Sequence, residues 1–175
     1  MKKNPKNNKR EYFVCSRNVC FGDTDLKKSS KDCYYNSNVY SEMSIKYNIK
    51  KFLNDYMDEY SVDWVTLQGE TYGEGIQKRT YSKKDHCFAA FNLIDSNNHR
   101  LNPIEGREKA TKGNIPWVPI VNDNFILPDS VEELLDQATG KSEIDGLPRE
   151  GLVFRNTTDD RSFKAVSNEY LLKCH

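Results

Sequence analysis

Hydrophobic residues recur with a helical period in two parts of this chain. Over residues 39–60 they recur every three or four positions, which predicts an amphipathic helix with one face in the core. A second, shorter helix is predicted over residues 129–139. Asp129 or Ser130 can act as its N-cap, and Gly140 follows its last turn.

Apolar residues that alternate with polar ones, or that form short runs, predict strands elsewhere. The predicted strands are residues 12–17, 62–68, 87–95, 150–155 and 162–167. The turn-rich segment NTTDDR joins the last two, so these form a hairpin. Residues 22–38 and 96–128 are expected as connections, and a short apolar burst at 115–121 could add an edge strand broken by prolines.

The composition limits the classes of protein to which this chain can belong. The 175 residues are 37% hydrophobic and 30% charged, which suits a single soluble domain. The formal net charge is zero, so contact with nucleic acid must depend on local charge. No apolar run is long enough to span a membrane and no apolar signal core follows the N-terminus, so we expect a cytoplasmic protein.

The five cysteines are odd in number and lack paired C-x-x-C spacing, which argues against a zinc site or a disulfide framework. We therefore expect free thiols. The basic, Asn-rich residues 1–10 are expected as a disordered tail, and residues 11–175 as one domain. His99, in a loop, and His86, beside a strand, have no partner at metal-ligand spacing and are interpreted as structural or solvated.

Glu150 and Lys164 are the first candidates for chemistry. Glu150 opens one strand of the C-terminal hairpin and Lys164 lies early in the other, so antiparallel pairing could bring a carboxylate and an ammonium together. Phosphate with a divalent metal is the usual occupant of such a pair. The alternative is a surface hairpin whose charges are solvated.

The sequence EGLVFR followed by SFKAVSN resembles motifs IV and V of the covalent nucleotidyltransferases, which include ATP-dependent RNA ligases, DNA ligases and capping enzymes. SRN, GETYGEGIQ and the strand at 87–95 resemble further RNA ligase motifs and occur in the same order. These matches span residues 12–173 and are most similar to the Deinococcus-type RNA ligases, in which an OB module precedes the nucleotidyltransferase domain.

The resemblance implies roles for three residues in the N-terminal part. Arg17 would contact phosphate and the incoming RNA 5′ end, which suits the bidentate guanidinium. Glu70 would accept hydrogen bonds from the ribose hydroxyls. Phe91 would stack on the adenine ring, with Phe88 as the alternative.

In the C-terminal hairpin, the resemblance places Glu150 near the metal and Lys164 on the α-phosphate. Lys173 is the nearby replacement for a second lysine of motif V, because Val166 occupies its usual position. The implied fold is α+β, with antiparallel sheets flanking an adenylate cleft in which Glu70, Phe91, Glu150 and Lys164 converge. The implied cofactors are ATP, bound as AMP, and Mg²⁺ or Mn²⁺, and the implied partners are RNA ends in a nicked duplex.

Such a ligase transfers AMP from ATP to a lysine, then to the RNA 5′-phosphate, and a 3′-OH finally displaces it. The lysine belongs to a K-x-D-G motif that is absent from this sequence, where Glu143 precedes IDG. We expect a ligase domain that begins after this motif, with a missing N-terminal segment or OB module, and that does not adenylate itself. The alternatives are a non-catalytic nucleotide or RNA-end binding remnant, or another superfamily member such as a DNA ligase or capping guanylyltransferase.

Overall fold

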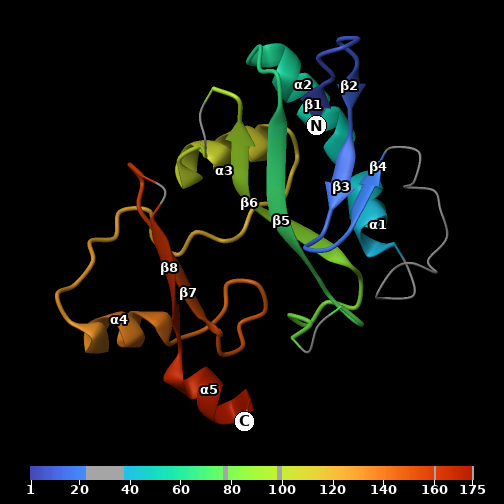
Figure 1. Ribbon diagram of the computed structural model, residues 1–175. Helices are drawn as coiled ribbons and strands as arrows, with labels where there is room; N and C mark the ends of the chain where they lie inside the picture. Colours follow the sequence, from blue (N-terminus) through green and yellow to red (C-terminus); the bar gives the residue numbers. More distant parts are fainter. Residues whose placement is uncertain (23–37, 77–78, 98–99, 160, 175) are drawn as a thin grey trace. The chain divides into compact units, whose positions relative to one another are not determined.

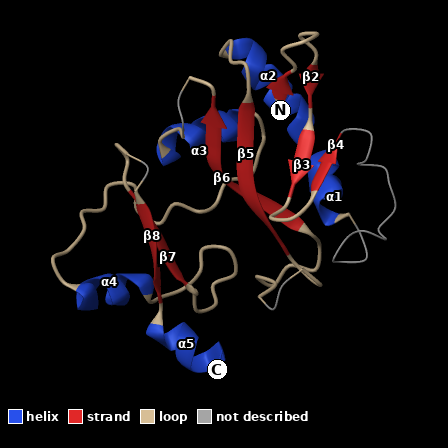
Figure 2. Cartoon of the chain, viewed as in Figure 1, coloured by secondary structure: helices blue, strands red, loops and turns tan. Residues whose placement is uncertain are grey.

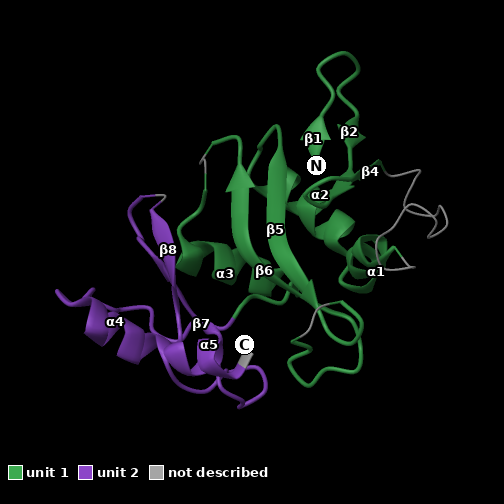
Figure 3. Ribbon diagram, turned by 60° about the horizontal axis from the view of Figure 1, so that its bottom comes forward, with its two compact units in different colours: residues 1–118 green, residues 119–175 purple. Residues whose placement is uncertain are grey.

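The computed structural model describes residues 1–22, 38–76, 79–97, 100–159 and 161–174. These residues divide into two compact units, 1–118 and 119–175 (Figure 3). Each unit is described by itself below. A Pro-rich, strand-poor connection follows Val118 at the boundary between the units, and the single domain expected over 11–175 stays a prediction.

The first unit is built on a two-stranded antiparallel sheet of β5 (Val65–Tyr72) and β6 (Cys87–Asp95) (Figure 1). Both strands were predicted, and the structure shows that they pair. Helix α2 (Ile49–Glu59) packs against β5, and α3 (Pro103–Lys112) packs against β6. The core between them contains Met57, Val65 and Leu93, all almost fully buried.

One predicted helix is in fact two, α1 (Val39–Lys46) and α2. They are separated at Asn48, whose backbone is left-handed with φ of 51°. Asn tolerates this conformation better than most residues, because its short side chain can hydrogen-bond locally. The helical period continues across the break and therefore could not show it.

The expected disorder of residues 1–10 is wrong. Strand β1 (Lys2–Lys3) pairs with β2 (Arg10–Glu11), and Met1 lies in the core with 9% of its surface exposed. The Met1 amino group donates a hydrogen bond to the Val65 carbonyl at 2.8 Å. The basic composition of residues 1–10 gave no indication that Lys2 pairs with Trp64, in the segment that leads into β5.

A second hairpin, β3 (Phe13–Cys15) with β4 (Cys20–Gly22), confirms the predicted strand before Arg17 and adds one that was missed (Figures 1 and 2). Helix α3 was also missed inside the expected connection 96–128. Its start was signalled by Asn102, which caps the Ile104 amide, followed by Pro103 at the first helical position. Within 115–121, Trp117 forms only an isolated bridge to Ala90.

The second unit contains α4 (Val131–Ala138), the hairpin β7 (Gly151–Arg155) with β8 (Ser162–Val166), and α5 (Asn168–Cys174). Helix α4 and the hairpin were predicted, and Ser130 is the N-cap that accepts from the Glu133 amide. Helix α5 was not predicted. Phe154 stacks on Phe163 with ring centroids 5.1 Å apart, which fixes one face of the hairpin.

Candidate nucleotide site

Glu150 and Lys164 lie in contact, as predicted. The Lys164 ammonium donates a hydrogen bond to Glu150 Oε1. Lys164 is paired with Val153 in the hairpin register, whereas Glu150 lies just before β7. The pair therefore occupies the end of the hairpin at which β7 begins, next to the start of α5.

Main-chain and side-chain hydrogen bonds hold Glu150 in place. Its carbonyl accepts from the Ser167 amide at 2.8 Å, which extends the pairing of β7 and β8 by one residue. The preceding Arg149 guanidinium donates to three carbonyls at the end of α4, those of Gln137, Ala138 and Thr139. Cationic donors suit a helix C-terminus, so Arg149 fixes the backbone from which Glu150 projects.

The ion pair is open to solvent. The side chains of Glu150 and Lys164 are 38% and 45% exposed, and an exposed pair of this kind contributes at most about 1 kcal/mol. A ligand phosphate or metal can therefore take over either partner at small cost. Among the residues that the structure describes, no three His, Cys, Asp or Glu side chains gather around a common point.

Glu70 projects from the solvent face of β5. Residues 65, 67 and 69 of this strand are buried or half-buried, whereas Thr66, Gln68 and Glu70 are exposed. No hydrogen bond joins the Glu70 carboxylate to any residue that the structure describes.

Phe91 lies at an irregularity of β6. Gln68 pairs with Asn92 and Gly69 pairs with Ala90, so the register skips Phe91 and leaves it as the extra residue of a bulge. Bulges bend a strand and redirect side chains, often beside active sites. Phe91 is half-buried.

The alternative aromatic, Phe88, belongs to the core. It is 9% exposed, and its ring covers Gly69 so closely that a Cβ there would lie 2.2 Å from the ring edge. Of the two aromatic candidates, only Phe91 retains surface for a ligand.

Two residues beside Glu70 were not found from the sequence. The Asn92 amide donates to Gln68 Oε1 at 2.7 Å, and Asn92 is 7% exposed. Gln68 and Glu70 share a strand face because they are two positions apart. This two-residue spacing could have identified Gln68 from the sequence. Only the structure shows that Asn92 contacts Gln68.

Arg17 and Lys173 are the remaining candidates. Arg17 is exposed in the turn between β3 and β4, and its guanidinium makes no hydrogen bond or ion pair within the described part of the chain. Lys173 lies in the last turn of α5, where it donates to Glu169 Oε1 at 2.5 Å. The structure thus joins Glu150 with Lys164 and places Glu70 and Phe91 on one sheet.

Of the other predicted features, His86 bridges Glu42 Oε2 at 2.9 Å and the Glu74 carbonyl at 3.2 Å, a structural position. His99 lies outside the described residues. None of the helices in the described ranges is both long and apolar enough to cross a membrane.

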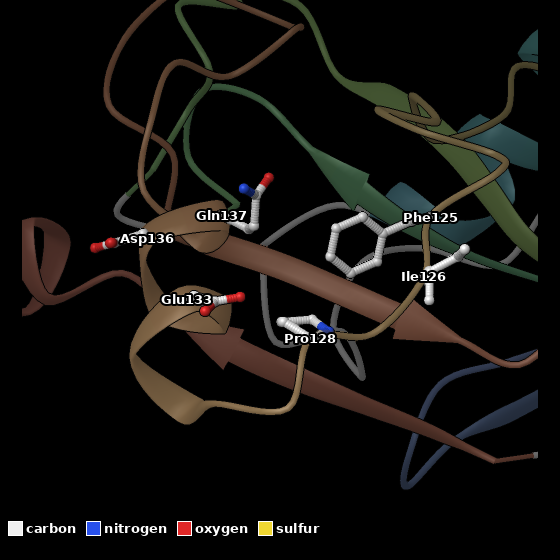
Figure 4. Close-up of a pocket in the computed structure, with 6 residues that line it drawn as sticks. All are labelled: Phe125, Ile126, Pro128, Glu133, Asp136 and Gln137. Carbon is white, nitrogen blue, oxygen red and sulfur yellow. The ribbon is translucent and has the colours of Figure 1, made fainter.

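Two cavities lie outside the candidate residues. One of about 280 Å³ in the second unit is lined by Phe125, Ile126, Pro128, Glu133, Asp136 and Gln137 (Figure 4). The other, of about 560 Å³, lies in the first unit beside α2 and α3. Lysines on its rim are paired, for example Lys112 with Glu59 at 2.6 Å, so it offers no free anion site.

Comparison with known proteins defines the class. The chain is similar to the Naegleria gruberi RNA ligase, solved as a variant with ATP and Mn, at 30% identity and a TM-score of 0.69 over 78% of this chain and 41% of that one. A second variant of that ligase with ATP and Mn matches at 25% identity and a TM-score of 0.70, over 92% and 46%. The fold is therefore that of an RNA ligase nucleotidyltransferase domain, of the α+β class predicted.

The RNA ligase family model matches residues 4–166, and the chain belongs to this family. It spans less than half the length of the Naegleria ligase chains that it matches. No match was found among curated proteins.

Proposed function

We propose that this chain acts in sealing RNA 3′-OH and 5′-phosphate ends through adenylated intermediates. In this proposal the first unit binds adenosine, with Glu70 on the ribose and Phe91 on the base. The second unit binds phosphate and metal through Lys164 and Glu150, and Arg17 contacts the RNA 5′-phosphate. The observation that carries the proposal is the Glu150–Lys164 pair in a hairpin of RNA ligase fold.

The spacing of that pair supports the assignment. Two of the Naegleria ligase structures carry alanine in place of a glutamate and of a lysine that lie 14 positions apart in that chain. Glu150 and Lys164 are also 14 positions apart. Equal spacing is what a hairpin with the same register and turn length would give.

The residues present fit a nucleotide and a divalent metal. Glu150 supplies hard carboxylate oxygens, which Mg²⁺ and Mn²⁺ prefer. Glu70, which has no competing partner in the described residues, supplies acceptor oxygens for the ribose hydroxyls. Lys164 and Arg17 supply cations for phosphoryl oxygens. When bound, the metal would neutralise charge on those oxygens.

Each side chain then has a separate task. Lys164 leaves Glu150 to donate to the α-phosphate, where it stabilises charge that grows during transfer. Glu150 is freed to hold the metal. Glu70 fixes the ribose with two acceptor oxygens, and Phe91 orients the adenine by stacking. Lys173 is a further phosphate contact, available once it releases Glu169.

The finer assignments belong to the same proposal. We place the chain in the Deinococcus-type branch, acting with Mg²⁺ or Mn²⁺ on nicked duplex RNA in cytoplasmic RNA repair, together with an N-terminal segment or OB module. The K-x-D-G lysine is absent from these 175 residues. We therefore expect no covalent AMP on this chain from ATP, but joining of RNA that already carries a 5′-adenylate.

The test compares two lysine variants in the second unit. Lys164→Ala should slow joining of pre-adenylated RNA at a nick by about a hundredfold or more, because one phosphate-stabilising charge is lost. Lys141→Ala removes an exposed lysine of the same unit that makes no ion pair within the described residues, and it should join at the wild-type rate. The readout is the ligated product on a denaturing gel.

A second arm measures binding of a fluorescent AMP analogue. Glu70→Gln should weaken it about tenfold, whereas Glu108→Gln, an exposed control in the same unit, should not. Equal joining by both lysine variants would contradict the role of Lys164. Binding of adenylated RNA without any joining would favour the non-catalytic RNA-end binding protein.

A further inference from the structure

The β3–β4 hairpin holds two thiols side by side. Cys15 and Cys20 are direct partners in the strand register, and their Sγ atoms are 3.4 Å apart. Both side chains are exposed. In Figure 1 this hairpin is the pair of blue strands beside α1.

The hairpin register places the two cysteines opposite each other in the type of antiparallel pair whose side chains lie nearest. The Ser16 amide donates to the Val19 carbonyl at 2.8 Å, so Ser16 and Val19 form a hydrogen-bonded pair. Hydrogen-bonded and non-hydrogen-bonded pairs alternate along an antiparallel ladder. Cys15 and Cys20 therefore form a non-hydrogen-bonded pair, in which the Cα atoms are about 4.5 Å apart and the side chains lie nearest each other.

We propose that Cys15 and Cys20 form a dithiol site that a small-molecule disulfide, such as oxidised glutathione, converts reversibly to an intramolecular disulfide. The Cα separation expected for this pair lies within the range that disulfides span. The sulfurs need only approach from 3.4 Å to bonding distance. Exposed disulfides are the labile, regulatory kind, and they can form transiently in reducing compartments.

The reaction is two successive thiol–disulfide exchanges. The Cys20 thiolate attacks one sulfur of the oxidant, the oxidant's S–S bond breaks, and one glutathione thiolate leaves. The Cys15 thiolate then attacks the Cys20 sulfur and expels the second glutathione thiolate. The two cysteines are oxidised by two electrons, the oxidant is reduced to two thiols, and these take up the two protons.

The order of attack follows from the surroundings of Cys15. Partial desolvation of the Cys15 sulfur, together with the hydrogen bond from its S–H to the Cys20 sulfur, raises the pKa of the Cys15 thiol. Cys15 therefore keeps its proton to higher pH, so it acts as the second nucleophile.

The disulfide would close the turn that presents Arg17. Only Ser16, Arg17, Asn18 and Val19 separate the two cysteines. A bond across the base of this turn restricts the backbone of Arg17 and so the directions that its guanidinium reaches. This consequence rests on the proposed contact between Arg17 and the RNA 5′-phosphate, whereas disulfide formation does not.

Trypsin offers a specific assay, because it cleaves after Arg17 between the two cysteines. The full chain is incubated with oxidised glutathione, remaining thiols are alkylated, and the digest is analysed by mass spectrometry. We expect residues 11–17 and 18–27 to remain joined, and this product to exceed any other intramolecular disulfide by about tenfold, since the two thiols have a high effective concentration. Dithiothreitol should separate the two peptides.

Two single variants serve as controls. Cys15→Ser and Cys20→Ser should each stop at a glutathione adduct on the remaining cysteine, with no joined peptides. A triple variant, Cys33→Ser with Cys87→Ser and Cys174→Ser, should still form the joined peptides to the wild-type extent. Stable glutathione adducts on both Cys15 and Cys20 in the wild type, without joining, would overturn the proposal.

A binding measurement tests the consequence separately. The affinity for 5′-phosphorylated RNA should change severalfold on oxidation of the triple variant and stay constant when its Cys15→Ser derivative is treated in the same way. Joined peptides with unchanged RNA affinity would contradict the role of Arg17 and leave the dithiol site intact.

Discussion

Replacing Gly151 by alanine should separate the two strands that carry Glu150 and Lys164. A Cβ at this position would lie 2.0 Å from the Ala165 carbonyl oxygen and 2.9 Å from Val166 Cα. Both atoms belong to the backbone of β8, so no side-chain rotation relieves the contact. The strands must therefore move apart locally by about 1 Å to restore ordinary van der Waals separation.

This separation of the strands lowers the free energy of unfolding. It lengthens the bond from the Ser167 amide to the Glu150 carbonyl from 2.8 Å to beyond hydrogen-bonding distance. Ser167 is 1% exposed, so water does not readily replace the lost partner. A lost hydrogen bond with a buried unsatisfied amide costs about 1–3 kcal/mol, and with the strain of the hairpin we expect a loss of about 2–4 kcal/mol.

Gly146→Ala is the matched control. Gly146 has φ of 71°, and no atom lies within 4 Å of the added Cβ. This variant therefore bears only the cost of a left-handed alanine, about 1–2 kcal/mol. The difference between the two variants isolates the steric contact with Ala165.

Hydrogen exchange followed by mass spectrometry is the appropriate assay, because both tryptophans, Trp64 and Trp117, lie in the first unit and fluorescence would not report on the second. Peptides covering 150–167 should exchange about tenfold faster for every 1.4 kcal/mol lost. The reasoning fails if Gly151→Ala and Gly146→Ala exchange at the same rate.

Further predictions concern the first unit, with urea unfolding followed by tryptophan fluorescence as the measurement. Tyr56→Phe should lower the free energy of unfolding by about 1.5–3 kcal/mol, because it removes a 2.5 Å hydrogen bond to the buried Asp95 carboxylate. Burial, with that hydrogen bond, raises the pKa of the Tyr56 phenol. The phenol therefore loses its proton at lower pH in the unfolded chain than in the folded one, so the wild-type free energy of unfolding should fall as pH rises above about 10. A free energy of unfolding that stays constant above this pH would contradict the role of the buried phenol. Asn48→Ala should cost about 1 kcal/mol for its left-handed backbone, and Asn48→Gly should not.

The sequence alone determined α2, α4 and the strands β3, β5, β6, β7 and β8. The period of Phe52, Tyr56 and Met57 identified α2, and the polar turn at 156–161 identified the β7–β8 hairpin with its Glu150–Lys164 contact. These features depend on neighbours close in sequence, so local patterns carry them. Motif resemblance identified the RNA ligase family, which the family match confirms.

The tertiary structure decided the features that depend on distant partners. Met1 enters the core only because the main chain pairs beside β5, and the polar composition of residues 2–10 gives no sign of it. The bulge that leaves Phe91 out of the register arises from the pairing of β5 with β6 and is invisible in either strand alone. The apposition of Cys15 and Cys20 likewise depends on the hairpin register, because their spacing matches no C-x-x-C pattern. In each case the deciding energy comes from contacts between segments, which local sequence periodicity does not encode.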